Sequence, residues 1–61
     1  MVKIIDLLND EVIGQVTKSV AYQIIKGDTI ILNDIKYMVR DRELTIDNPR
    51  NVNITLYVVL L

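Results

Sequence analysis

The chain contains no cysteine, histidine, tryptophan or phenylalanine. Without cysteine it can form neither a disulfide nor a thiolate metal site, and without histidine a zinc site would need carboxylates alone. Histidine is also the usual general acid or base at neutral pH, and a domain this small has little room for a dry pocket that would tune a carboxylate or a lysine. We therefore predict a protein that is not an enzyme and that has no catalytic residues, metal site or cofactor.

Aromatic side chains and excess charge of one sign are also scarce. The three tyrosines do not cluster in the sequence, so the aromatic groove of a polyproline-binding SH3 domain is excluded. The net charge is −1, which argues against nucleic acid as a partner. The longest apolar run, residues 57–61, is far shorter than the roughly 20 residues needed to cross a bilayer. Asp6 interrupts the apolar N-terminal stretch, so we expect no signal peptide or membrane span and a soluble, cytoplasmic protein.

Aliphatic residues dominate the composition. Hydrophobic residues make up 51% of the chain, and the many Ile and Val residues favour strands. The 61 residues form one domain, residues 1–61, and a chain of this size buries only about 60% of its unfolded surface. Since disulfides and metals are excluded, self-association is the remaining way to gain stability, and we predict a homo-oligomer.

Apolar stretches alternate with turn residues along the whole chain, a pattern that predicts a small all-β domain. The expected strands are residues 2–8, 12–17, 29–32, 35–46 and 52–61. Gly14 is expected at a bulge or a close backbone contact, and a bend or bulge is expected in residues 40–43. The expected turns lie at residues 9–11, at Gly27-Asp28, at the two-residue hairpin connection Asn33-Asp34, and at residues 47–51.

One segment also fits a helix. Val12, Val16, Val20 and Ile24 recur at four-residue spacing, which would give a helix over residues 11–26 on a three-stranded antiparallel sheet. This alternative fold would be α+β. Gly14 and the β-branched residues weigh against it, because each lowers the stability of a helix.

Two motifs resemble a known group of proteins. They are Tyr22-x-Ile24-x-x-Gly27-Asp28-x-Ile30-x-Leu32 and the later Tyr37-x-Val39, followed by an alternating C-terminal strand. The pattern resembles small uncharacterised phage and prophage proteins with an SH3-like barrel, and the resemblance runs from about Val2 to Leu60. It implies a five-stranded SH3-like barrel whose long final hairpin closes the barrel, and it implies a phage-type origin.

The last strand carries the predicted oligomer interface. Its alternation assigns one face to the core, namely Val52, Ile54, Leu56, Val58 and Leu60. Tyr57, Val59 and Leu61 then share the outward face. A Lys or Pro residue in an apolar strand disfavours pairing with another chain, and this strand has neither. We therefore predict that these three residues contact a second copy.

Four cations in the second half of the chain form the other candidate site: Lys36, Arg40, Arg42 and Arg50. Arginine forks suit phosphates and carboxylates, so sets from two protomers could hold a small anionic ligand such as a cyclic nucleotide. The competing interpretation is an ordinary solvated face, because Asp41 and Glu43 alternate with Arg40 and Arg42.

These observations predict function only in outline. The leading hypothesis is a phage-type accessory protein that self-associates and binds a host or defence protein, or a small anionic ligand at a subunit interface. It would act in the cytoplasm, which is the host cell cytoplasm if a phage encodes it. The alternative is a structural or assembly protein of a virion, and a DNA-binding regulator is third.

Overall fold

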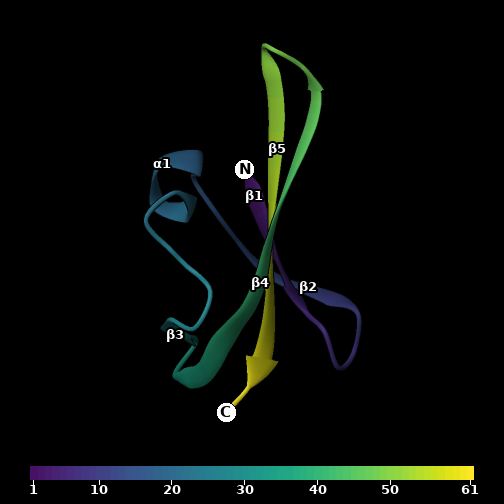
Figure 1. Ribbon diagram of the computed structural model, residues 1–61. Coiled ribbons are helices and arrows are strands. Elements are labelled where there is room, and N and C mark those ends of the chain that lie inside the picture. Colours follow the sequence, from purple (N-terminus) through teal and green to yellow (C-terminus); the bar gives the residue numbers. More distant parts are fainter.

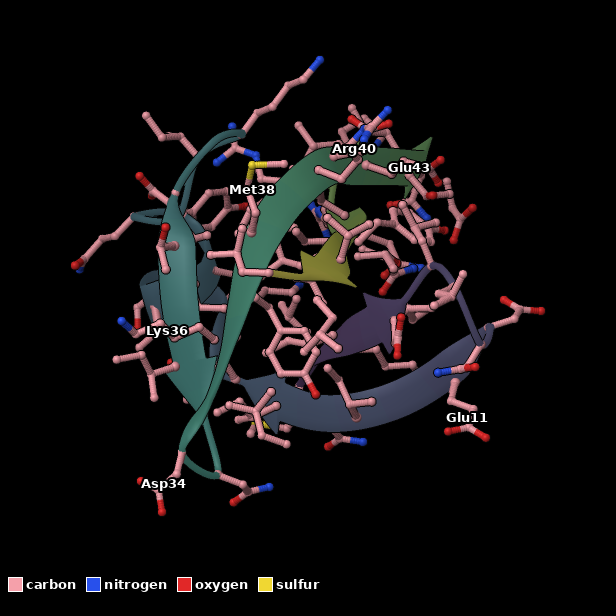
Figure 2. All side chains as sticks on the ribbon, turned by 90° about the horizontal axis from the view of Figure 1, so that it is seen from below. Glu11, Asp34, Lys36, Met38, Arg40 and Glu43 are labelled. Atoms are coloured by element: carbon pink, nitrogen blue, oxygen red, sulfur yellow. The ribbon has the colours of Figure 1, made fainter.

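The computed structural model describes residues 1–61 and consists of five strands and one short helix. The elements are β1 (Val2–Asp6), β2 (Glu11–Val16), α1 (Lys18–Ala21), β3 (Thr29–Leu32), β4 (Ile35–Asn48) and β5 (Asn51–Leu60). The strands form one sheet in the order β2-β1-β5-β4-β3, in which β1 and β5 run parallel and the other neighbours antiparallel. The sheet curls into a half-barrel (Figures 1 and 2), which confirms the predicted small all-β fold of five strands.

The alternative helix over residues 11–26 is wrong. Residues 11–16 are strand β2, in which Val12 and Val16 pair with Ile5 and Val2 of β1. The only helix, α1, has four residues; the Thr17 side chain caps it by accepting a hydrogen bond from the Val20 N–H at 3.3 Å. No helix of this structure is long and apolar enough to cross a membrane.

All four predicted turns are present, although the first covers residues 7–10 and the last only Pro49 and Arg50. Three residues with positive φ build the two turns between them. Asn33 and Asp34 have φ of 52° and 65°, as a two-residue hairpin connection requires. Gly27 has φ of 95°, which other residues rarely adopt. The turn at Gly27 is joined to β4: the Gly27 N–H donates to the Val39 carbonyl, and the Val39 N–H donates to the Asp28 carbonyl, each at 2.8 Å.

The first strand is shorter than the predicted range 2–8. It ends at Asp6, whose carboxylate accepts hydrogen bonds from the Leu8 N–H and the Asn9 side-chain amide, each at 3.0 Å. These bonds hold residues 7–10 in a turn. Asp6 is buried, and its carboxylate oxygens both have hydrogen-bond partners.

A bulge in β4 decides which side chains face the inside of the half-barrel. The register with β5 shifts between Val39, which pairs with Val58, and Asp41, which pairs with Tyr57. Before the shift the odd-numbered residues Tyr37 and Val39 face inward and are buried. Beyond it the phase reverses, so the even-numbered residues face inward. The predicted bend in residues 40–43 is therefore confirmed as a bulge at Arg40.

Eight apolar residues form the buried core: Val2, Ile4, Ala21, Tyr37, Val39, Ile54, Leu56 and Val58. The prediction for β5 holds for its middle part but not for Leu60, which is 58% exposed near the end of the strand. The two edge strands approach each other across the open side of the half-barrel at Gly14 and Leu32. A Cβ on Gly14 of β2 would lie 3.0 Å from Cδ2 of Leu32 on β3. Gly14 thus occupies a close contact, and it lies beside Ile13, the extra residue of a bulge in β2.

Candidate interaction surfaces

The hairpin of β4 and β5 reaches beyond the rest of the sheet. β3 pairs with β4 only as far as Met38, and β1 pairs with β5 only from Thr55 onward. Residues 42–48 of β4 and 51–54 of β5 therefore have partners only within the β4–β5 hairpin, and we call them the arm. Figure 1 shows the arm projecting past the other strands. The remaining part of the half-barrel is called the body.

The arm carries two exposed apolar side chains on the inner face. Leu44 is 50% exposed and Ile46 is 66% exposed, although the bulge turns both toward the inside. Across the hairpin they pair with Ile54 and Val52, of which Ile54 is buried and Val52 is partly buried. We call Leu44, Ile46, Val52 and Ile54 the arm's inner face. It is an apolar strip that is buried at its base and exposed toward its tip.

The predicted oligomer interface lies on the opposite, outer face of the sheet. Tyr57 and Val59 do point outward, but both are partly buried, whereas Leu61 is 65% exposed just after β5 ends. Val59 pairs with Met38 of β4, which Figure 2 shows on the outer side of the sheet. Tyr57 pairs with Asp41 on β4 and with Ile5 on β1. The three predicted residues therefore form an outer apolar row, and only its C-terminal end is widely exposed.

A groove of about 390 Å³ opens on this outer face. Its lining residues are Leu7, Lys26, Arg40, Asp41, Glu43 and Tyr57. Arg40 and Glu43 lie close together on the outer side of β4 (Figure 2). The Tyr57 hydroxyl donates a hydrogen bond to Oε2 of Glu43 at 3.3 Å. Two cations and two carboxylates thus share a groove whose formal charge sums to zero.

The environment of Tyr57 shifts its titration. Partial burial raises the pKa of the Tyr57 phenol, and the neighbouring Glu43 carboxylate raises it further by its charge and by accepting the hydrogen bond. Asp10 and Asp41 contribute smaller effects in the same direction. The phenol therefore remains a neutral hydrogen-bond donor at neutral pH, and it links β5 to the first residues of the arm.

The four predicted cations do not form one group within a single chain. Lys36 lies at the start of β4, while Arg40 lines the outer groove. Arg42 follows the bulge and turns inward, where its guanidinium donates a hydrogen bond to the Ile24 carbonyl at 3.2 Å. Arg50 lies in the turn at the arm's tip. An anion site built from these residues would have to combine cations from different protomers.

Sequence reasoning missed Lys26 as the second cation of the groove, and it missed the exposure of Leu44 and Ile46. The groove could not be found from spacing, because Lys26 and Arg40 are brought together by the backbone bonds between the Gly27-Asp28 turn and Val39. The arm did leave a signal. The predicted strand over 35–46 was several times longer than the strand over 29–32 beside it, so its far half could have no partner on that edge.

The chemistry available on these surfaces is binding through apolar and charged contacts. No group of three or more His, Cys, Asp or Glu residues is placed to hold a metal ion. The groove combines one phenol, two cations and two carboxylates, and the arm's inner face offers only aliphatic side chains. No protein-family model, no curated protein and no solved structure matches this chain.

Proposed function

We propose that this protein is a non-enzymatic binding protein that works as an assembly of identical copies, in the manner of a phage-type accessory factor. One observation carries the proposal. Only eight apolar residues form the buried core, whereas thirteen large apolar residues are exposed. Among them, Leu44 and Ile46 share one face of the arm, and Leu60 and Leu61 are adjacent at the end of the chain. Because exposed apolar side chains that lie together mark interaction sites in soluble proteins, this distribution fits a protein completed by a partner.

The size of the exposed surface supports the same conclusion. The chain exposes 4451 Å², whereas a compact monomer of 7.0 kDa exposes about 4,000 Å² by the usual scaling of surface with mass. The surplus of about 400 Å² comes with an elongated shape, 35 × 21 × 18 Å. A small domain with so little buried surface gains stability by covering its apolar side chains with another copy.

The outer groove suits recognition of a further partner. Lys26 and Arg40 stand beside Asp41 and Glu43, so the groove offers hydrogen bonds and charges of both signs. This arrangement supports a protein partner, such as a host or defence protein, more than a small anion, because the two carboxylates would repel a free anion. We place this action in the cytoplasm, which is the host cytoplasm if the chain is phage-encoded.

A second candidate is an assembly protein of a virion. The observation that favours it is the number of unpaired strand edges: β2 and β3 each have a free outer edge, and both edges of the arm lack a neighbour. Free edges can pair with other chains without limit, which would build open polymers instead of closed oligomers.

The test is light scattering coupled to size exclusion, at two protein concentrations. A defined oligomer of constant mass is the expected result, and it supports the binding protein. A mass that keeps growing with concentration favours the assembly protein. A monomer at both concentrations contradicts the proposal, because the exposed apolar side chains would then need no second copy.

A further inference from the structure

We infer that the arm's inner face is the surface on which a second copy docks, with the inner faces of two arms packed against each other about a two-fold axis. This inference rests on the proposed self-association, and it names the contact surface. It differs from the interface predicted from sequence, which lies on the outer face at Tyr57, Val59 and Leu61.

The arm lacks the support that the body has. Its two strands pair with each other alone, and neither outer edge has a neighbouring strand. A two-stranded hairpin by itself is at best marginally stable in water, and it becomes stable when a third strand or a packed layer is added. The arm ends in a simple turn at Pro49 and Arg50, so nothing within the chain covers its tip.

The arm's inner face is the part of the arm whose apolar side chains would be buried by a second layer. Leu44 and Ile46 face inward by the same alternation that buries Ile54 and Leu56 further down, yet they are 50% and 66% exposed. The side chains of one sheet face are buried when a second sheet packs on it about 10 Å away. A second arm supplies such a layer with the same spacing of side chains.

The absence of exposed charge on the strip suits another copy as the occupant. Between Arg42 and Ile46, the only ionised side chain on the inner side is Arg42, at the base of the arm, and its guanidinium donates a hydrogen bond to the Ile24 carbonyl. Glu43 faces outward and bonds Tyr57. The exposed strip is therefore neutral and aliphatic, and it complements a neutral aliphatic surface. Packing two such strips about a two-fold axis buries no like charges against each other.

The size of a stable interface sets the extent of the contact. Such an interface takes about 800 Å² from each partner, more than four side chains can supply when Ile54 is buried and Val52 is partly buried. The contact must therefore reach beyond the two strips. One candidate for this extension is Val20, which is exposed on α1, a helix that contacts β5.

The first experiment compares two variants, each with one positive charge added to a different face of the arm. Ile46→Lys places it on the inner face, and Thr45→Lys places the same charge on the neighbouring residue of the outer face, where Thr45 pairs with Asn53. Both side chains are exposed in the single chain, so both variants should fold, which circular dichroism checks. We expect Ile46→Lys to weaken self-association about tenfold or more, as loss of a central apolar contact does, and Thr45→Lys to leave it unchanged.

The second experiment uses the lack of cysteine, because any introduced thiol is then unique. Three single-cysteine variants are oxidised under mild conditions: Ile46→Cys, Thr45→Cys and Val59→Cys. The fraction of disulfide-linked dimer formed by each variant is then measured on a non-reducing gel. We expect rapid cross-linking of Ile46→Cys alone. Cross-linking of Val59→Cys alone overturns the arm interface while leaving the proposed self-association intact. Equal rates at all three positions overturn it as well, since they indicate random collision. A wild-type protein that is monomeric in light scattering overturns both proposals.

Discussion

The body and the arm share the strands β4 and β5 and the same alternation of side chains, but they differ in burial. In the body, Leu56 and Val58 are fully buried because β5 has β1 on one side and β4 on the other. In the arm, Leu44 and Ile46 alternate in the same way and remain half exposed or more. Alternation thus determines which face a side chain occupies, whereas neighbouring elements determine whether that face is dry.

The bulge at Arg40 connects the two regions. Without the extra residue, the phase set by Tyr37 and Val39 would continue and would turn Leu44 and Ile46 to the outer face. With it, the inner side of the body continues directly into the inner side of the arm. The bulge therefore makes the arm's apolar strip an extension of the core, in the place where a second layer can cover both.

The two regions should differ most in how much stability is lost when an apolar side chain is truncated to alanine. Leu56→Ala should lower the free energy of unfolding by about 2–5 kcal/mol, because Leu56 is fully buried and its removal leaves a cavity. Ile46→Ala should change the stability of the single chain by only about 0.5 kcal/mol or less, as exposed positions do. Urea unfolding at low protein concentration measures both values.

Ile54 lies at the boundary and sharpens this comparison. Because Ile54 is buried, Ile54→Ala should also lower the free energy of unfolding by about 2–5 kcal/mol, as expected for a core residue. A near-neutral Ile54→Ala would mean that the core ends below the arm's base. A large loss for Ile46→Ala at low concentration would contradict the exposure of the arm in the single chain.

A smaller effect is expected where the edge strands of the body meet. Gly14→Val would force its side chain against Leu32, since even a Cβ there would lie 3.0 Å from Cδ2 of that residue. Overpacking of this kind costs about 1–3 kcal/mol. A substitution to valine in the arm, Thr45→Val on the exposed outer face, should be close to neutral. Urea unfolding again gives both values.

A double-mutant cycle shows whether the cost comes from this contact. Leu32→Ala removes the atoms that Gly14→Val would strike, so the double variant should lose less stability than the sum of the two single variants. Strict additivity would mean that β2 and β3 do not touch in solution, and that the body is more open than the structure shows.

Much of this fold could be predicted from the sequence because the decisive features are local. The positive-φ turns at Asn33-Asp34 and Gly27, the bulge near Arg40 and the inward face of the middle of β5 all follow from turn chemistry and alternation. The helix α1 was not predicted. Its four residues are too few to show helical spacing, and its start depends on the single Thr17 cap.

The candidate sites could be predicted only in part because they depend on distant contacts. Alternation placed Tyr57 and Val59 on the outer face correctly, but it could not show how far their neighbours cover them. The four cations shared a stretch of sequence, yet the bulge sends Arg40 and Arg42 to opposite faces. Whether any of these residues bind a second copy or another ligand stays a prediction.

The smallest expected effect concerns the hydrogen bond that joins the body to the arm, from the Tyr57 hydroxyl to Glu43. In the folded chain the pKa of Tyr57 is raised, by partial burial first and then by Glu43. The folded state therefore holds the phenolic proton more tightly than the unfolded state. The resulting stability is fully present below about pH 10 and is lost as the pH rises through the folded pKa. Glu43→Gln should lower the pKa of Tyr57 and flatten this loss. In a variant with Tyr22→Phe and Tyr37→Phe, the absorbance of tyrosinate follows Tyr57 alone, with Asp47→Asn at the arm's tip as the matched control. An unchanged pKa in Glu43→Gln would show that the arm moves independently of the body at this point.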